Sequence, residues 1–261
     1  MKKWLNWIAL VVIFSVACGF LANWQFARRE AKLASIELVK QNYDAKAASL
    51  SEVSTGSEFD LPKMTWRTVS MNGHYLPEKL LLVRNRPNDG QPGFEAVVPF
   101  LGANGELVYV SRGWIPNGSN QDYPDDLTMP DASETTILAH LMAEEPILNR
   151  SAPRGQIATI NVQLANKQTG LMSSFTNGYL RLISETPSVG TRLKPMPAPA
   201  TEEGNNLSYA LQWILFGLMA ALALLWRIRK DMQLAKGIVP KVKLSRSDLD
   251  AKFEDETTIE K

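Results

Sequence analysis

Residues 4–22 read WLNWIALVVIFSVACGFLA, and residues 207–226 read LSYALQWILFGLMAALALLW. The two runs are apolar and contain 19 and 20 residues. Because a helix rises about 1.5 Å per residue, each run is long enough to span a hydrocarbon core of about 30 Å. The sequence therefore predicts two transmembrane helices, with the residues between them on one side of the membrane.

Cations beside the outer ends of the runs predict the orientation, since Lys and Arg near a span are retained in the cytoplasm. These cations are Lys2, Lys3, Arg227, Arg229, Lys230 and Lys236. Arg28, Arg29 and Lys32 follow the first run and oppose this assignment, but two spans require both termini on the same side. We expect a multi-pass protein of the cell (plasma) membrane, with cytoplasmic termini and an extracytoplasmic central domain.

The first run has a second interpretation, a cleaved signal peptide, because it follows two lysines and carries small residues at 17–19. The apolar pattern continues past them to Trp24, which favours an uncleaved anchor. Cys18 is the only cysteine. The central domain therefore has no internal disulfide and no cysteine-based metal site.

The pattern between the runs changes near Gly56. Apolar residues at helical spacing continue to Leu50, whereas short β-branched and aromatic runs separated by turn residues follow. We predict strands at about 66–75, 79–84, 94–101, 106–112, 135–142 and 178–184. Asn104-Gly105 predicts a hairpin, because both residues accept positive φ.

These patterns predict an α+β protein in which two transmembrane α-helices flank a mainly antiparallel β domain, either one curled sheet or a small barrel. The predicted parts are a first transmembrane helix at 1–25, an outward helical extension at 26–55, an extracytoplasmic β-rich domain at 56–206, a second transmembrane helix at 207–228 and a disordered cytoplasmic tail at 229–261.

Catalytic and metal-binding motifs are missing from the sequence. Its only histidines, His74 and His140, fall in predicted strands, and neither belongs to a nucleophile elbow, a phosphate loop or a zinc motif. The net charge is +1, and the sequence has no stripe of basic residues with interleaved aromatics. These properties give no reason to expect a nucleic-acid partner. We expect neither an enzyme nor a metal site.

Aromatic and glutamine residues mark the ends of the runs that face the central domain. Tyr209, Gln212 and Trp213 share one helical face, and Trp24, Gln25 and Arg28 follow the first run. Tyr and Trp commonly anchor helices at a bilayer boundary. Anchoring does not explain Gln212, whose amide needs a hydrogen-bond partner in the membrane. We predict a bond from Gln212 to the first helix near Gln25 or Trp24, or to another membrane partner.

Residues 108–116, VYVSRGWIP, end a predicted strand with a cation, a glycine and a large aromatic. One interpretation is a strand terminator in which Trp114 plugs the sheet. The other is a partner or ligand surface, where Arg112 holds an anionic group.

Three segments resemble the signatures of the surfeit locus protein one family of cytochrome c oxidase assembly factors. They are LANWQFAR at 21–28, the central set Arg84, Arg86, PGF at 92–94, VVP at 97–99 and SRGWIP at 111–116, and YALQW at 209–213. The resemblance covers nearly all of Leu21 to Phe216. It implies a membrane-bound assembly factor that assists maturation of the oxidase's catalytic subunit or insertion of haem a.

One position departs from the family pattern. Several relatives carry a histidine where this chain has Asn206, and neither apolar run contains a histidine. Asparagine is a poor iron ligand. Haem a, the cofactor that the resemblance implies, is then held through His74, by a partner's residues, or not at all, and Arg28 and Arg112 are the candidates for its propionates or for acidic partner loops.

The leading hypothesis is a non-enzymatic membrane chaperone with the lipid bilayer and the oxidase catalytic subunit as partners; a homo-oligomer is left open. The alternative is a two-pass structural or sensory protein whose β domain binds an extracytoplasmic ligand unrelated to respiration.

Overall fold

A computed structural model describes residues 2–121, 123–127 and 129–237. Its elements in chain order are α1 (Lys2–Asn42), α2 (Leu50–Val53), β1 (Ser54–Thr55), β2 (Glu58–Phe59), α3 (Leu61–Met64), β3 (Thr68–Tyr75), η1 (Pro77–Lys79), β4 (Leu81–Val83), β5 (Gly93–Gly102), β6 (Leu107–Pro116), β7 (Thr135–Ala143), β8 (Gln156–Ile157), α4 (Val162–Thr169), β9 (Gly178–Thr186) and α5 (Asn206–Ala235). Most of the predicted disordered tail, residues 238–261, lies outside the described residues.

The chain divides into two compact units, which we describe separately. One unit contains α1 up to Glu30 together with α5, and the other contains residues 31–203. This division confirms the predicted fold class, two long apolar helices flanking a β domain.

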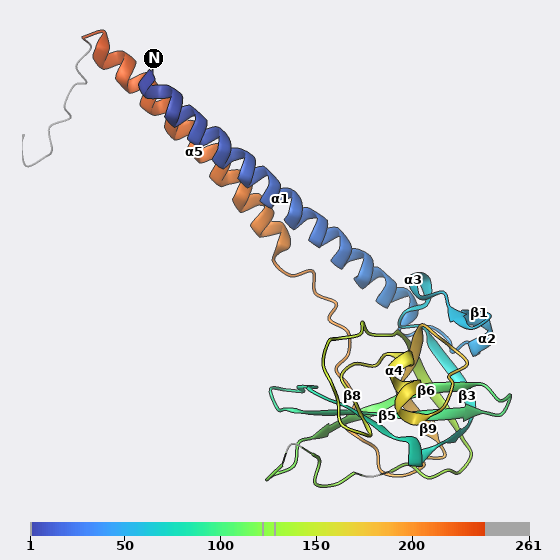
Figure 1. The fold of residues 1–261 in the computed structure, drawn as a ribbon. Coiled ribbons are helices and arrows are strands. Elements are labelled where there is room, and N and C mark those ends of the chain that lie inside the picture. Colours follow the sequence, from blue (N-terminus) through green and yellow to red (C-terminus); the bar gives the residue numbers. More distant parts are fainter. Residues whose placement is uncertain (1, 122, 128, 238–261) are drawn as a thin grey trace, which may run out of the picture. The chain divides into compact units, whose positions relative to one another are not determined.

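Within the first unit, α1 and α5 run side by side in opposite directions (Figure 1). The side chains buried between them are small: Cys18, Ala22 and Ala210. A Cβ placed on Gly217 would lie 3.6 Å from the Cβ of Cys18. Small residues allow the backbones of paired membrane helices to approach closely. Both helices are long and apolar enough to cross a membrane, with mean hydropathies of 2.3 and 1.8.

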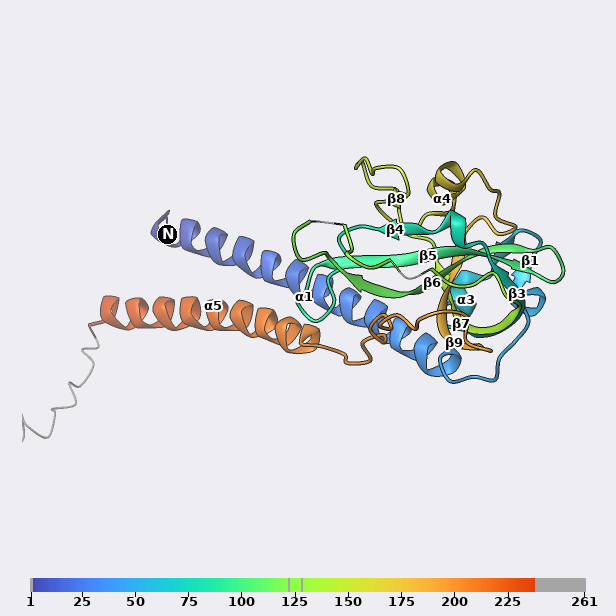
Figure 2. The same ribbon diagram turned by 90° about the horizontal axis from the view of Figure 1, so that it is seen from below.

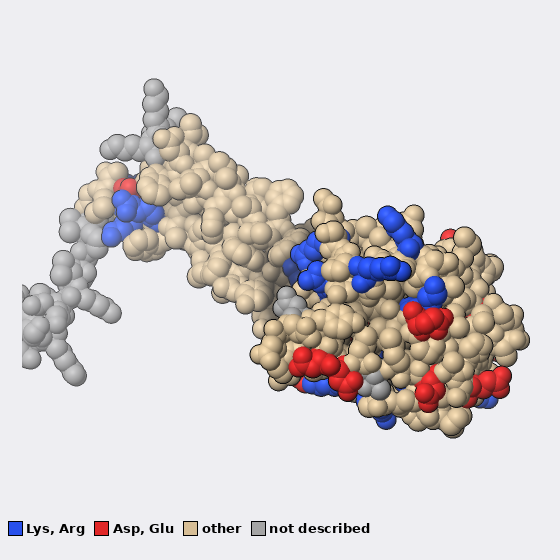
Figure 3. Space-filling view, turned by 60° about the horizontal axis from the view of Figure 1, so that its bottom comes forward, with Lys and Arg blue, Asp and Glu red and all other residues tan. Residues whose placement is uncertain are grey.

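Charge is distributed along the helix pair as a membrane-spanning segment requires. On the face shown in Figure 3, Lys and Arg side chains gather at one end of the helix pair, and the middle of the pair carries no charged side chain. A charged side chain at the centre of a bilayer is costly, so an uncharged middle matches the predicted spans.

The second unit is a mixed β-barrel. Five strands close a ring in the order β3-β7-β9-β6-β5, because β5 also pairs with β3 through Gly73↔Gly102 to Tyr75↔Phe100. Every pairing in the ring is antiparallel except β6–β9, which is parallel. The strands β4 and β8 extend the sheet beyond β5, and α4 lies beside them (Figure 2).

Two of the three apolar clusters cover the two faces of β5 and β6. The larger one fills the barrel interior with fully buried side chains from opposite strands, among them Val69, Val98, Val110 and Leu180. The second lies on the other face of β5 and β6, where Val97 and Tyr109 pack beneath β4, β8 and α4. Side chains that alternate between these clusters explain why β5 and β6 are buried on both faces.

The first helix ends earlier than the predicted extension to residue 55. Asn42 is the last residue of α1, and its side-chain amide donates hydrogen bonds to the carbonyl oxygens of Lys63 and Thr65. The chain then lies along β3, where Ala48 accepts a bond from Ser70 and donates one to Thr68. The hydrogen bonds to β3 replace the helix that the spacing of the apolar residues up to Leu50 favours.

Candidate functional site

On α1, the signature residues Trp24, Gln25 and Arg28 lie on consecutive turns. The guanidinium carbon of Arg28 lies 5.0 Å from the centre of the Trp24 ring, a cation–π contact. Trp24 is 51% exposed and Gln25 is half-buried. Half of the Trp24 surface is therefore available to a lipid or a partner.

On α5, one signature residue, Ala210, is fully buried. Trp213 packs edge-on against Phe216 with ring centres 5.8 Å apart, whereas Tyr209 and Gln212 are exposed. The side-chain amide of Gln212 makes no hydrogen bond within the described part of the chain. Two residues along a helix turn the side chain by about 200°, so Gln212 points away from the face that Ala210 buries. The predicted bond to Gln25 or Trp24 is not formed, and a bond to another membrane partner stays a prediction.

In the barrel, Arg112 owes its position to a β-bulge. Val97 pairs with Ser111 and Ala96 pairs with Gly113, so Arg112 is an extra residue in β6. A second irregularity makes Ile183 the extra residue of β9, because Leu138 pairs with Ser184 and Ala139 with Leu182. Bulges re-aim neighbouring side chains.

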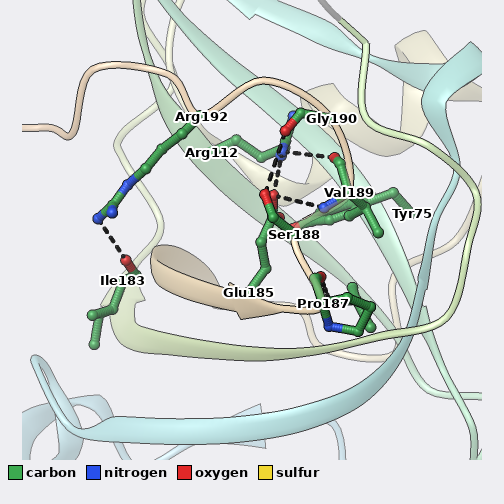
Figure 4. A network of polar contacts seen from close by, with 10 residues as sticks. Tyr75, Arg112, Ile183, Glu185, Pro187, Ser188, Val189, Gly190 and Arg192 are labelled. Carbon is green, nitrogen blue, oxygen red and sulfur yellow. Dashed lines mark hydrogen bonds and ion pairs between the residues drawn. The ribbon is translucent and has the colours of Figure 1, made fainter.

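Arg112 is the centre of a buried polar network (Figure 4). Its Nη2 donates to Oε1 of Glu185 at 2.8 Å and to the carbonyl oxygen of Val189 at 3.1 Å. Its guanidinium carbon lies 5.0 Å from the centre of the Tyr75 ring, and the Tyr75 hydroxyl donates to Glu185. Burial, reinforced by the Glu185 carboxylate, raises the pKa of Tyr75, so this hydroxyl stays a donor.

Trp114 is also buried, and it fixes two loops. Its indole Nε1 donates to the carbonyl oxygen of Arg86 at 2.6 Å, and its backbone N–H donates to Lys194 at 2.7 Å. The side chain is 4% exposed. Because Arg112 and Trp114 are buried, the structure favours the interpretation of residues 108–116 as a strand terminator over their interpretation as a partner or ligand surface.

A second buried ion network lies on the opposite face of β6. Arg86 pairs with Glu95 and Glu145, and the Ser111 hydroxyl donates to Glu95. Burial works against the charged form of Arg86, but the Glu145 and Glu95 carboxylates raise its pKa. Burial raises the pKa of Glu95 against the opposing effects of Ser111 and Arg86. This network joins the Arg86 signature residue to β5 and to the segment after β7.

The two histidines lie in strands, His74 in β3 and His140 in β7. His74 is half-buried. His140 is buried, and its ring stacks on Tyr43 with centres 4.1 Å apart. Burial lowers the pKa of His140, which keeps its imidazole neutral at neutral pH.

Comparison with known proteins gives one family for most of the chain. The model of the SURF1 family matches residues 12–218, from within α1 to within α5. The chain belongs to the SURF1 family. The match includes part of each apolar helix and all strands of the barrel.

Individual relatives within the SURF1 family are distant. The chain is 29% identical to an uncharacterized SURF1-like protein of Mycobacterium bovis, over 85% of this chain and 82% of that protein. It is 27% identical to a SURF1-like protein of Dictyostelium discoideum, over 73% of this chain and 65% of that protein. It is 26% identical to surfeit locus protein 1 of Arabidopsis thaliana, over 44% of this chain and 35% of that protein.

Sequence reasoning found the signature cations of this SURF1 chain but missed their acidic partners. Glu185 and Glu145 are single acids in or next to strands, and Glu95 sits in the middle of a buried strand. A carboxylate within an otherwise apolar strand is the signal that could have indicated buried pairs, since acids are rarely buried unless they are paired.

Proposed function

We propose that this chain is a non-enzymatic, membrane-bound assembly factor for haem–copper cytochrome c oxidase, acting on its catalytic subunit. The observation that carries the proposal is the family match over residues 12–218, which includes the barrel and part of each helix of the pair. The SURF1 family is linked to oxidase assembly. The barrel lies on the outer side of the cell membrane and both termini lie in the cytoplasm.

The outward faces of the helix pair supply the docking surface. Tyr209 and Gln212 project from α5 away from buried Ala210, and Trp24 is half exposed on α1. In hydrocarbon, an amide without a partner is unfavourable, so a partner helix that offers a hydrogen bond to Gln212 is bound in preference to lipid. The catalytic subunit, a membrane protein, is the proposed source of that helix.

The polar groups of the barrel support a structural role in this function. Arg112 and Glu185 hold each other, and Arg86 is held by Glu95 and Glu145. In the described residues no group of three or more His, Cys, Asp or Glu side chains could hold a metal ion. We propose that the barrel is a rigid body that shields the maturing subunit.

The residues of the helix pair do not fit an axial imidazole ligand for haem. Asn206 begins α5, and the only two histidines of the chain belong to barrel strands. We assign no step of haem transfer to the helices. Contact between haem a and His74 stays a prediction, which a Soret band in the purified protein and its loss in His74→Ala would support.

A deletion strain tests the function. We expect reduced assembled oxidase and reduced haem a content, with recovery when the unaltered chain is supplied. Normal oxidase in the deletion strain would instead favour a structural or sensory protein that is unrelated to respiration.

A further inference from the structure

A cavity of about 450 Å³ opens on the outer side of the barrel. Its wall is built from the segment after α1, the start of β3, the outward faces of β7 and β9, and the segment 192–197 that leads away from β9. Pockets for small ligands usually measure about 300–1,000 Å³, so this one suits a small molecule with a single ring or two fused rings.

Three aromatic rings form one wall of the cavity. His140 stacks on Tyr43 with ring centres 4.1 Å apart, and Trp66 meets His140 edge-on at 5.9 Å. The backbone of Trp66 has φ 69°, which is rare for a bulky residue and is held by a hydrogen bond from its N–H to Leu141. The three rings come from separate segments. Tyr43 and His140 lie nearly parallel, at 27°, whereas the plane of Trp66 stands at 70° to that of His140. Together they give this side of the cavity an aromatic wall.

Two arginines face this aromatic wall. The guanidinium carbon of Arg181 lies 5.2 Å from the centre of the Trp66 ring, and its Nε is buried without a hydrogen-bond acceptor in the described residues. Arg192 is exposed at the rim and uses Nη2 to donate to the Ile183 carbonyl oxygen. A buried N–H without an acceptor is unfavourable, which makes an incoming oxyanion a favourable partner.

Acidic side chains near the cavity do not neutralise these cations. Asp44 is the one acid among the described residues that line the cavity, and it is exposed to solvent. Glu95 is a buried acid that interacts electrostatically with Arg181, but its carboxylate is already paired with Arg86 and hydrogen-bonded by Ser111. The cavity is therefore positively charged on balance.

A smaller cavity of about 150 Å³ shares Leu182, Ile183, Arg192 and Pro195 with the first. It is lined by Arg112, whose side chain is 2% exposed. The Nε and Nη1 atoms of Arg112 are buried and lack acceptors among the described residues, whereas Nη2 is bonded to Glu185 and Val189. A third set of guanidinium donors therefore lies next to the aromatic cavity.

We propose that the cavity formed by Tyr43, Trp66, His140, Arg181 and Arg192 is a binding site for a small flat aromatic anion. The ring of the ligand lies against the three aromatic side chains, and its carboxylate or phosphate accepts hydrogen bonds from Arg181 and Arg192. Both arginines present planar donor groups that match the oxygen spacing of either anion. The site is independent of the helix pair and goes beyond the proposed assembly function.

Equilibrium dialysis of the purified full chain in a neutral detergent tests the site, with detergent alone in a parallel chamber. The probes are 2-naphthoate, 2-naphthyl phosphate and the neutral analogue 2-naphthylmethanol. We expect saturable one-to-one binding of at least one anion and at least about tenfold weaker binding of the neutral analogue, since the contacts involve charged groups. Binding of either anion supports the proposal, and the ratio of their affinities identifies the preferred group.

Two variants and a matched control locate the binding. Arg181→Gln and Arg192→Gln should each weaken anion binding about 10- to 100-fold, whereas Arg150→Gln, the same charge change at an exposed loop residue, should leave it unchanged. Arg192 lies at the rim, so its variant keeps the test valid if Arg181→Gln fails to fold. The proposal is overturned if neither anion binds saturably, if the neutral analogue binds as tightly, if Arg192→Gln has no effect, or if Arg150→Gln has an equal one.

Discussion

The Nη2 atom of Arg112 lies 2.8 Å from Oε1 of Glu185, and the two side chains are 2% and 7% exposed. The pair joins β6 to β9, which are the two parallel neighbours in the ring. A charge buried this deeply is tolerated only when it is paired, because each ion has lost most of its hydration. The stability of the barrel should therefore depend on both residues together.

Arg112→Met should destabilise the chain by about 3–5 kcal/mol, because it leaves the buried Glu185 carboxylate without its partner. The double variant Arg112→Met/Glu185→Leu should recover most of this loss, since two apolar side chains replace the pair. Unfolding of the full chain by denaturant, monitored in detergent, measures both. A single variant that loses less than about 1 kcal/mol would show that the pair is not needed for stability.

Gly113→Ala should displace the segment that follows β9. The residue has φ 145°, and an added Cβ would lie 2.6 Å from the carbonyl oxygen of Lys194 and 2.9 Å from the Cβ of Leu193. We expect a lower melting temperature and faster proteolysis near Lys194. Gly19→Ala is the control, since a Cβ there meets no atom within 4 Å. Equal stability of the two variants would contradict the close approach.

His140 should make stability depend on pH. Burial lowers its pKa, so the unfolded chain binds a proton to this imidazole more readily than the folded one does. The free energy of unfolding should fall as the pH drops below about 6.5, by up to about 1.4 kcal/mol per pH unit. Its charged neighbours Arg181 and Asp44 act in opposite directions, with Arg181 favouring the neutral imidazole.

The variant His140→Phe isolates this effect because it keeps a ring to stack on Tyr43. Glu95 has the opposite effect on stability. Its pKa is raised in the folded chain, so the free energy of unfolding falls as the pH rises above the ordinary pKa of a carboxyl group. Both proteins contain Glu95, so subtracting their free energies of unfolding at each pH removes the Glu95 contribution. Parallel pH profiles for the two proteins would refute the role of His140.

Gln212→Leu should weaken association with the oxidase catalytic subunit without unfolding the helix pair. The side chain of Gln212 is exposed on α5, and its amide makes no hydrogen bond within the described residues, so replacing it removes no internal hydrogen bond. Copurification of the subunit with the tagged chain is the readout. Gln233→Leu, the same change at another exposed residue of α5, is the control. Undiminished copurification of Gln212→Leu would exclude the amide as a docking contact.

Gly217→Cys should form a disulfide with Cys18. A Cβ on Gly217 would lie 3.6 Å from the Cβ of Cys18, within the range of about 3.5–4.5 Å found in disulfides. Oxidation with a copper catalyst, followed by counting of free thiols with a heavy maleimide, should show both thiols lost. Leu218→Cys is the control, because Leu218 is 57% exposed. Equal cross-linking at both positions would contradict the packing of α1 on α5.

Much of the fold could be predicted from local patterns. The two apolar runs are long and uniform, and the Asn104-Gly105 turn has φ 79° at Gly105, as a hairpin requires. The strands of the ring follow from alternating apolar residues and turn residues between them. The parallel β6–β9 pairing could not be predicted, because strand order depends on contacts between distant segments.

The candidate site was less predictable for a similar reason. Arg112 and Trp114 stood out by residue type, but their burial depends on a bulge that no local pattern reveals. Arg112 and Glu185 are 73 residues apart in the chain. The aromatic and cationic residues of the outer cavity come from separate segments, so only the folded chain brings them together.

The position of β9 in the ring has a consequence for the order in which the protein can be built. The strand made last, Gly178–Thr186, sits between β7 and β6 rather than at an edge. A nascent chain that has not yet reached Thr186 therefore exposes two unpaired strand edges, and open edges promote aggregation. A premature stop anywhere before that residue should remove the barrel as well as the second apolar helix, so such a truncated product is expected to be cleared as a misfolded protein.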